Sequence, residues 1–301
     1  MKTRNKKYAF IILFLLPSVL LFGIIYAYPL VNIFITSFQK WNYKNITNPT
    51  FLGFSHMFDN YIRLFTKDYY FMTSLLNSLK WMVLALIIQV PLAIIVALVL
   101  SNKPRGWKFT RNAFIIPNII SSAAIGLIFL NLYDPARGAI TEIVKFFNPS
   151  SNINILANEK MAFWGVSFSF VLFAGTSALL LLAQIFAIPK PLFESAKIDG
   201  ANQLQTIIYI TLPLVKNAIG TISILAANYG LLIYNEIALI TAGGPDRATY
   251  SISFFIERTA LGSSKLNFAL ANTAGVIQLI LGLILVGLIT KVFNTGKSYN
   301  D

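Results

Sequence analysis

The stretch Trp81–Asn102, WMVLALIIQVPLAIIVALVLSN, decides the fold class of this chain. Its 22 residues include no Asp, Glu, Lys or Arg, and Lys80 and Lys103 bound it on either side. A helix needs about 20 mostly apolar residues to cross the hydrocarbon core of a bilayer. The strands of a membrane barrel alternate apolar and polar residues over about ten positions, and the run Leu92–Leu100 does not alternate. The stretch therefore predicts a membrane-spanning α-helix.

Five further charge-free runs in the 301-residue sequence are long enough to cross a membrane. They are Tyr8–Gln39, Asn112–Tyr133, Met161–Pro189, Asn217–Asn235 and Leu266–Thr290. We therefore predict an all-α integral membrane protein with six transmembrane helices. The first run exceeds one span, so residues 34–39 are expected to leave the membrane. A cleaved signal peptide is the alternative for this run, but its apolar stretch is longer than about 15 residues and no small-residue cleavage site follows.

The composition excludes several other classes of protein. Hydrophobic residues make up 56% of the chain and charged residues 12%, whereas soluble domains have about 45–50% and about 25%. The chain has no cysteine and a single histidine, His56. Disulfides, Cys-ligated metals, a thiol nucleophile and His-rich metal sites are therefore excluded.

The distribution of Lys and Arg predicts the orientation of the chain in the membrane. With the N-terminus inside the cell, the inner segments hold 13 Lys and Arg in 59 positions, and the outer segments hold 10 in 92. Because Lys and Arg are enriched in cytoplasmic loops, we expect both termini to be cytoplasmic. The net charge of +13 is then explained by topology. No solvated groove of interleaved basic and aromatic residues indicates nucleic-acid binding.

The inner segment between the fourth and fifth runs predicts a helical hairpin. It reads IPKPLFESAKIDGANQLQTIIYITLPLVK from Ile188 to Lys216, and its two early prolines are expected to end the fourth span. Asp199-Gly200 is a turn signal. Two short helices are expected on either side of this turn, over Leu192–Ile198 and Ala201–Thr211.

The predicted hairpin is amphipathic. Glu194 is expected in the first turn of the first helix, where the helix dipole favours an acid, and it is three residues from Lys197. The second helix carries the apolar residues Leu204, Ile207 and Ile208. An exposed apolar ridge beside charges favours docking into a groove of a partner protein, and an ordinary connector is the alternative.

The hairpin also resembles a known motif, the EAA loop of ABC importer permeases. The matching pattern is Glu194-Ser-Ala-x-x-Asp199-Gly200-Ala201, followed by Ile210-Thr-Leu212-Pro213. The resemblance implies coupling helices that sit in a cleft of a cytoplasmic ATPase. The residues to which it gives this coupling role are Glu194, Ser195, Ala196, Asp199, Gly200, Ala201, Leu212 and Pro213. Ser195 departs from the usual alanine, and Ile207-Ile208 stand where a phenylalanine is common.

Further motifs resemble the sugar-transport subfamily of these permeases, in particular the first permease of maltose- and glycerol-phosphate-type systems. They are Ala27-Tyr28-Pro29-Leu30, Asn60-Tyr61-x-x-Leu64-Phe65, Arg105-Gly106, and Thr241-x-Gly243-Gly244-Pro245. The resemblance implies a type-1 transmembrane domain at residues 73–290 with its coupling loop at 190–213. An N-terminal helix and outer loop at 1–72 precede this domain, and a cytoplasmic tail at 291–301 follows it.

The resemblance further implies partners for this chain in a bacterial cell membrane. They are a second, similar permease subunit wrapped by the first helix, two cytoplasmic ATPase subunits and an external solute-binding protein. ATP and Mg²⁺ are expected on the ATPase, because this chain has no GxxxxGK[ST] phosphate loop. We therefore expect a transport subunit that binds no cofactor itself, not an enzyme.

Polar and aromatic residues within the spans are candidates for the transport pathway, because polar groups in lipid usually face protein or water. Amides, hydroxyls, phenols and aromatic faces suit a sugar. The candidates are Asn118, Ser122, Ser169, Phe173, Thr176, Asn228, Tyr229, Tyr234, Asn235 and Glu236. The alternative for each is hydrogen bonding between helices as packing, the role that we expect for Gln89 and Gln278. In the last span, Ala271, Gly275 and Gly282 are spaced for close helix contact.

Three other functions remain as alternatives to a carbohydrate permease. An ABC permease for glycerol phosphate or a peptide is one, although an anionic solute favours Lys or Arg in the spans and the six runs contain none. An ion-coupled secondary carrier usually has acids or bases deep in the membrane, and only Glu236 approaches that. A membrane enzyme would need a His, Asp and Glu cluster that the sequence does not offer.

Overall fold

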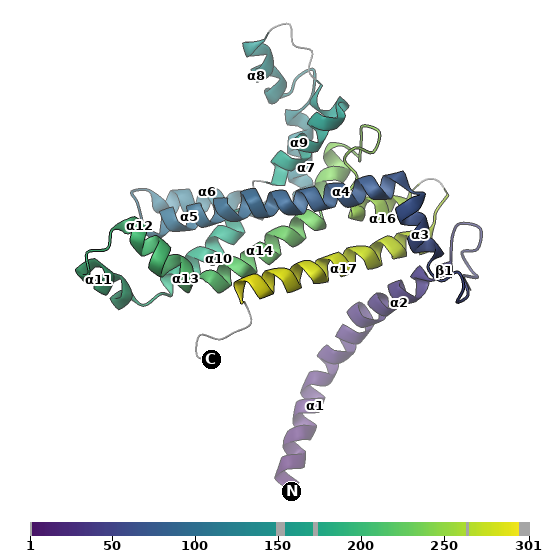
Figure 1. Cartoon of the computed structure of the whole chain (residues 1–301), viewed down its shortest axis with the longest axis horizontal. Coiled ribbons are helices and arrows are strands. Elements are labelled where there is room, and N and C mark those ends of the chain that lie inside the picture. Colours follow the sequence, from purple (N-terminus) through teal and green to yellow (C-terminus); the bar gives the residue numbers. More distant parts are fainter. Residues whose placement is uncertain (1, 149–153, 171–173, 263–264, 295–301) are drawn as a thin grey trace. The chain divides into compact units, whose positions relative to one another are not determined.

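The computed structural model describes residues 2–148, 154–170, 174–262 and 265–294, and their regular structure is almost all helical (Figure 1). The chain divides into two compact units. The first comprises Met1–Tyr69 and Ile256–Ile277, and the second comprises Tyr70–Phe255 and Gln278–Asp301. The described residues include five helices long and apolar enough to cross a membrane, or six if one bent pair counts as a span.

The first unit begins with one long helix that has an apolar, exposed surface. It comprises α1 (Lys2–Phe22), the π-helical turn η1 (Gly23–Ala27) and α2 (Tyr28–Ser37). The helix therefore continues through residues 34–37, which we had expected to leave the span. Within its candidate span, Phe10–Ser37, the most apolar window has none of its residues buried. This surface is therefore open to lipid or to another subunit.

A small loop structure follows the first helix in the same unit. β1 (Gln39–Lys40) pairs antiparallel with β2 (Thr50–Phe51), and α3 (Asp59–Thr66) follows. The Nδ2 atom of Asn60 donates to the carbonyl oxygens of Ser37 and Gln39 at 2.8 and 2.9 Å. α3 is thereby fixed to the end of α2.

The second unit contains the remaining helices. One helix of 33 residues is formed by α4 (Tyr69–Leu84), η2 (Ala85–Gln89) and α5 (Val90–Ser101), and it begins well before Lys80. The others within or beginning in this unit are α6 (Trp107–Ile119), α7 (Ser122–Leu132), α8 (Ala139–Phe147), η3 (Ile155–Ala157), α9 (Glu159–Phe170), α10 (Ala174–Phe186), α11 (Lys190–Ile198), α12 (Gln203–Thr206), η5 (Ile207–Thr211), α13 (Leu212–Leu214), α14 (Lys216–Leu231), α15 (Asn235–Ile240) and α16 (Ile252–Leu261). The last helix, α17 (Phe268–Phe293), belongs to both units.

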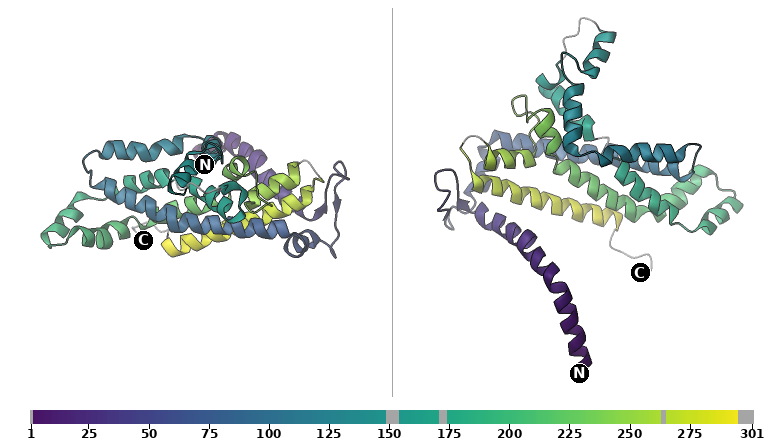
Figure 2. Two further views of the ribbon diagram at one scale, coloured as in Figure 1. Left: turned by 90° about the horizontal axis from the view of Figure 1, so that it is seen from above. Right: turned by 180° about the vertical axis from the view of Figure 1, so that it is seen from behind.

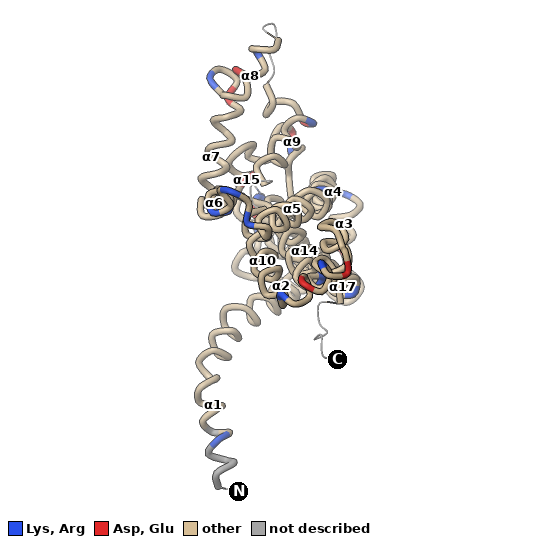
Figure 3. The backbone as a smooth tube through the Cα atoms, turned by 90° about the vertical axis from the view of Figure 1, so that its left-hand side faces the viewer, with Lys and Arg blue, Asp and Glu red and all other residues tan. Residues whose placement is uncertain are grey.

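Charged residues lie mainly in loops and near helix ends, as the colours along the backbone in Figure 3 show. Lys80 is an exception, because it lies inside the long α4–α5 helix, with its Nζ atom 5.5 Å from the ring centre of Phe163. The membrane-spanning lengths are otherwise nearly free of charge, as the charge-free runs predicted.

Three π-helical turns each end two residues before a proline. η1, η2 and η5 precede Pro29, Pro91 and Pro213 respectively. Proline has no N–H to donate to the carbonyl four residues earlier, and its ring crowds that carbonyl. The wider π turn accommodates the proline without breaking the helix. The sequence therefore keeps long helices despite its internal prolines.

The third predicted span is not one straight helix, which corrects the prediction for Asn112–Tyr133. α6 and α7 meet at an angle of 95° around Ile120 and Ser121. Both residues are extended, with ψ of 132° and 145°, and the Oγ atom of Ser121 accepts a hydrogen bond from the N–H of Ala124 at 3.2 Å. Ser121 therefore begins a new helix.

Trp81 lies at the centre of the core of the second unit. Its side chain is fully buried, and its ring stacks on Phe163 with centroids 4.9 Å apart. Its Nε1 atom donates to the Oγ atom of Ser167 at 2.9 Å. Backbone atoms of Trp81 lie so close to Gly230 on α14 that an added Cβ there would be 2.5 Å from the Trp81 carbonyl oxygen. The long helix and α14 therefore meet backbone to backbone.

Of the residues predicted to pack between helices, one has the expected contacts and the others do not. Gln278 has the expected interhelical role, because its Nε2 atom donates to the Leu231 carbonyl at 3.1 Å and the Ser253 hydroxyl at 2.8 Å. Gln89 is buried, and its Oε1 atom has no hydrogen-bond partner among the described residues. At Gly275 and Gly282 an added Cβ would have its nearest atoms at 3.7 and 3.8 Å, which is ordinary contact. Neither position requires glycine, so the expected close helix contact is not found there.

Candidate functional site

The hairpin between α10 and α14 lies at the end of the second unit where α5 ends and α14 begins (Figures 1 and 2). Its first helix, α11, ends in two hydrogen bonds that together form a Schellman motif. The N–H of Gly200 donates to the Lys197 carbonyl at 3.2 Å, and the N–H of Ala201 donates to the Ala196 carbonyl at 2.9 Å. Gly200 has φ of +78°, a conformation that favours glycine. The turn predicted at Asp199-Gly200 is confirmed.

The second arm of the hairpin begins with a capping box. The Oδ1 atom of Asn202 accepts from the N–H of Gln205, and the Oε1 atom of Gln205 accepts from the N–H of Asn202, both at 2.8 Å. We had expected this arm to start at Ala201. It starts instead at Gln203, because Asn202 is its N-cap. The arm continues through η5 into α13.

The first arm also differs from its prediction in detail. α11 begins at Lys190, so Glu194 is not in its first turn. Among the described residues, Glu194 and Lys197 form no salt bridge, and both are exposed. Glu194 and Asp199 therefore stay free for contacts outside the chain.

The hairpin has an anchored side and an exposed side. Ala196 is buried, and Phe193, Leu212 and Leu214 pack against the hydrophobic core of the spans. Other apolar side chains of the hairpin are exposed, with Ile198 86% accessible. The further exposed apolar residues are Leu192, Leu204, Ile208 and Tyr209. Ser195 and Pro213 are also exposed. The arrangement presents apolar and acidic groups together on a hairpin attached to two spans.

The bend between α6 and α7 brings together several of the predicted pathway residues. Asn118, in the last turn of α6, accepts at its Oδ1 atom a hydrogen bond from the Thr176 hydroxyl on α10 at 2.9 Å. Ser122, the first residue of α7, accepts at its hydroxyl a hydrogen bond from the Nδ2 atom of Asn235 on α15 at 2.7 Å. Two polar pairs therefore flank the bend and join it to the fourth and fifth predicted spans. Thr176 and Asn235 are exposed.

A third polar pair lies nearby in the sequence, between α14 and α15. The Tyr229 hydroxyl donates to the Oε1 atom of Glu236, whose side chain is only 2% exposed. Tyr229 also lies 6.5 Å, centroid to centroid, from the ring of Phe170 on α9. The carboxyl of Glu236 is therefore enclosed and paired in this conformation, and it is not presented to solvent.

The remaining predicted pathway residues do not join these pairs. Ser169 is fully buried, and its hydroxyl donates to the Val166 carbonyl of its own helix at 2.7 Å, which is a packing role. Tyr234 precedes α15 and lies 6.0 Å from the ring of Phe254. Asn228 is half-buried on α14. Phe173 lies outside the described residues.

Two glycines that sequence reasoning missed allow close contact between spans. An added Cβ at Gly175 would overlap the Phe114 carbonyl oxygen and lie 2.5 Å from the Nδ2 atom of Asn118. Gly230 has the same kind of contact with the backbone of Trp81. The only sequence signal is the general enrichment of small residues where membrane helices meet, and it does not identify the facing helix.

Among the described residues, no three His, Cys, Asp or Glu side chains lie together as potential metal ligands. The groups available around the bend are neutral hydroxyls and amides. Their chemistry is hydrogen bonding to a polar, uncharged molecule.

Comparisons with known proteins place this arrangement in a family. The family described as "Binding-protein-dependent transport system inner membrane component" matches residues 89–296. The probable ABC transporter permease protein YurN of Bacillus subtilis is 29% identical over 95% of this chain and 96% of its own. The multiple sugar-binding transport system permease protein MsmF of Streptococcus mutans is 28% identical over 91% of each.

A solved structure shares the fold. It is that of a bacterial ABC transporter involved in the import of the acidic polysaccharide alginate, with a TM-score of 0.82, 22% identity, and coverage of 98% of this chain and 99% of that chain. The predicted fold class and the predicted transport role are confirmed. The chain belongs to the family of binding-protein-dependent transport system inner membrane components, the membrane-spanning permease subunits of ABC transporters.

Proposed function

We propose that this chain forms part of the pathway through which an ATP-driven importer moves an uncharged carbohydrate across the cell membrane. The observation that carries the proposal is the bend in the third span. Two polar pairs flank this bend, and their residues come from the third, fourth and fifth predicted spans. Transporter sites commonly form where a membrane helix is discontinuous, because the freed polar groups there face substrate. Exposed Thr176 and Asn235 offer such groups.

The chemistry of this region favours a neutral sugar over a charged solute. Hydroxyl and amide groups match sugar hydroxyls, and the six charge-free runs hold no Lys or Arg for a phosphate. The permease MsmF, similar to this chain, belongs to a multiple sugar-binding transport system. An ion-coupled carrier is disfavoured, because Glu236 is buried and bound by Tyr229. A permease for glycerol phosphate or a peptide remains the second candidate.

The hairpin of α11, α12, η5 and α13 would dock into a cytoplasmic ATPase, which would bind ATP and Mg²⁺. Its exposed apolar residues and exposed acids support this role, because apolar side chains that lie outside the core suit a partner groove. α10 and α14 are attached directly to the hairpin. Movement of the hairpin would therefore move the helices that carry Thr176 and Tyr229, and so alternate the access to the pathway.

The other partners follow the same scheme. A second, similar permease would cover the exposed apolar surface of α1 and α2, and an external binding protein would deliver the sugar. Two ATPase copies would serve the two permeases. Both termini would be cytoplasmic, since Lys and Arg are denser in the segments on that side.

Reconstitution tests the proposal as a whole. Proteoliposomes that contain this chain with its second permease and ATPase should take up a labelled neutral oligosaccharide only with internal ATP and an external binding protein. Uptake by this chain alone without ATP would contradict the proposal. Uptake of a phosphorylated solute in preference to the neutral one would favour the second candidate.

The substitution Asn235→Ala tests the pathway site. It removes the donor to Ser122 and one potential hydrogen bond to the sugar, and a neutral hydrogen bond contributes about 0.5–1.5 kcal/mol. We expect the sugar concentration for half-maximal uptake to rise about three- to tenfold. The measurement is the initial rate of uptake in proteoliposomes at varied sugar concentration, with the binding protein held constant.

The matched control is Ser169→Ala. This substitution also removes one polar group from a span, but the Ser169 hydroxyl is buried and bound to its own helix. Uptake should change less than twofold. If Ser169→Ala impaired uptake as much as Asn235→Ala, the pathway would not run past the bend.

A further inference from the structure

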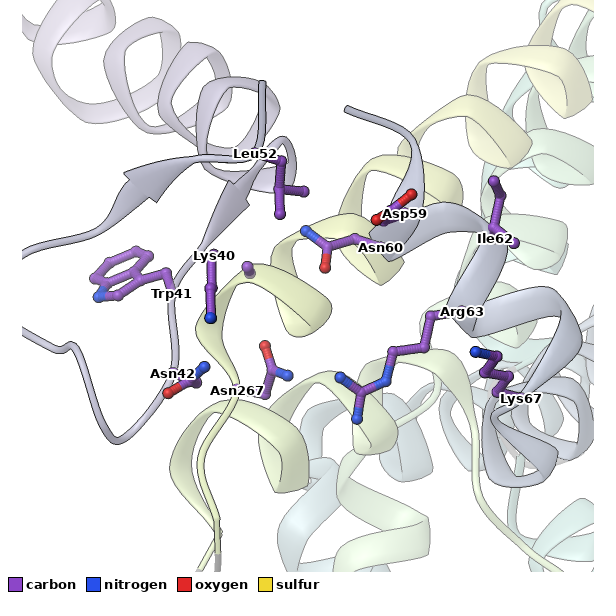
Figure 4. A pocket seen from close by; sticks show the side chains of 11 residues that line it. Lys40, Trp41, Asn42, Leu52, Asp59, Asn60, Ile62, Arg63, Lys67 and Asn267 are labelled. Atoms are coloured by element: carbon purple, nitrogen blue, oxygen red, sulfur yellow. The ribbon is translucent and has the colours of Figure 1, made fainter. Parts of the chain in front are cut away.

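A basic pocket in the first unit lies beside the ends of two membrane helices (Figure 4). It has a volume of about 410 Å³, within the size range of small-ligand sites. Lys40, Arg63 and Lys67 line it, together with one acid, Asp59. Figure 4 shows Lys40, Arg63 and Asn267 pointing into the same space. The pocket therefore has an excess of positive charge.

The cations of the pocket have no salt-bridge partner among the residues that the structure describes. In the described part of the chain, Lys40, Arg63 and Lys67 take part in no salt bridge, and their side chains are exposed. Asp59 instead lies 3.2 Å from the Nδ1 atom of His56. A cluster of cations that forms no salt bridge within the described residues is complementary to an anionic group from outside.

The pocket is held in shape by contacts on both of its sides. The N–H of Ala269 donates to the Trp41 carbonyl at 3.0 Å, and the N–H of Tyr43 donates to the Leu266 carbonyl at 2.9 Å. The rings of Trp41 and Phe268 have centroids 4.9 Å apart. With Asn60 bound to the end of α2, these contacts preform the pocket. A ligand would therefore bind without the cost of ordering a loop.

The position of the pocket relative to the bilayer indicates which kind of anion it would bind. The candidate span Phe10–Ser37 has 28 residues, which at about 1.5 Å per residue gives a length near that of a whole bilayer with its headgroups, about 40–45 Å. Lys40 and Trp41 come three and four residues after this span, and Asn267 comes directly before α17. Trp, Lys and Arg at such positions are typical of the membrane–water interface. The pocket therefore lies at headgroup level.

An apolar side chain for contact with acyl chains lies at the pocket itself. Ile62 lines the pocket and is exposed. A lipid can therefore place its phosphate among the cations and its chains against Ile62.

We propose that this pocket binds the phosphate of an anionic membrane lipid. Arg63 would hold the phosphate oxygens through its planar fork, and Lys40 and Lys67 would add point charges. The amide of Asn267 would bind a headgroup hydroxyl, as in phosphatidylglycerol. The lipid would fix the outer loop and the first helix in the membrane, separately from any sugar that passes through the second unit.

Spin-labelled lipids test this site on the purified full chain in phosphatidylcholine nanodiscs. Labelled phosphatidylglycerol should be immobilised in preference to labelled phosphatidylcholine. Arg63→Gln and Lys40→Gln should each lower the affinity for phosphatidylglycerol about fivefold, since a basic residue near a membrane surface contributes about 1 kcal/mol. The matched control Lys44→Gln removes a cation of the same loop that does not line the pocket, and it should leave the affinity unchanged.

Several results would overturn the proposal. Equal immobilisation of both lipids would show that the pocket takes no anionic headgroup, and an equal loss in Lys44→Gln would show diffuse surface charge only. Displacement of the label by glycerol 3-phosphate at a similar concentration would show a site for a soluble phosphate ester. Lys67→Gln provides a second variant if Arg63→Gln lowers the thermal midpoint of the detergent-solubilised chain.

Discussion

Gly200→Val is expected to lower ATP-driven uptake at least tenfold while the chain still inserts into the membrane. Gly200 has φ of +78°, and a left-handed conformation costs other residues about 1–2 kcal/mol, with β-branched residues worst placed. An added Cβ at Gly200 would meet nothing within 4 Å, so the effect acts through the backbone alone. The turn would rearrange, and α11 and α12 would no longer present one surface to an ATPase.

Gly200→Asn is the matched control for this prediction, because asparagine tolerates a positive φ and fills similar space. We expect it to keep most of the uptake. The readouts are uptake in proteoliposomes and co-purification of the ATPase with the permease. Normal uptake by Gly200→Val, or equal loss in both variants, would show that the conformation of this turn does not couple the subunits.

Gly230→Ala is expected to destabilise the chain by about 3 kcal/mol or more, at the upper end of the usual cost of overpacking. The new Cβ would lie 2.5 Å from the carbonyl oxygen and 2.7 Å from the carbonyl carbon of Trp81. Both are backbone atoms inside a long helix, so neither can move aside as a side-chain tip can. The measurement is the thermal midpoint of the detergent-solubilised chain, together with its yield in the membrane.

Gly282→Ala provides the control for this second prediction. It makes the same change in another membrane helix, where the nearest atom to an added Cβ is 3.8 Å away. Its thermal midpoint should stay close to that of the wild type. A midpoint for Gly230→Ala equal to that of Gly282→Ala would mean that α14 does not pack on the backbone of Trp81.

The turn of the hairpin was predictable because its signals are local. Gly200 signals a chain reversal, and the structure shows it to be the left-handed residue of a helix stop. The start of the second arm was wrong by two residues, because Ala201 completes the stop of α11 and Asn202 caps the next helix. These hydrogen bonds join residues only a few positions apart. The same local sequence is nevertheless compatible with several patterns of capping hydrogen bonds, so the exact start of the helix was not predictable.

The pathway residues were predictable only as a set. Asn118, Thr176, Ser122 and Asn235 were candidates because each is polar within an apolar run, but their pairing depends on the bend at Ile120 and Ser121. The same polarity criterion also selected Ser169, which bonds only its own helix. Polarity therefore identified residues that need a partner, and it did not identify the partner.

The sequence by itself determined that this protein spans a membrane, roughly where it does so, and that one loop forms a hairpin. It could do so because hydrocarbon excludes charge, so that the spacing of charges along the chain reports the spans directly. Only the tertiary structure decided that the third span bends, which polar groups meet there, and that Gly175 and Gly230 make close contacts whereas Gly275 and Gly282 do not. These features depend on which helix faces which. In lipid that choice rests on shape and hydrogen bonds between distant segments, which no local pattern records.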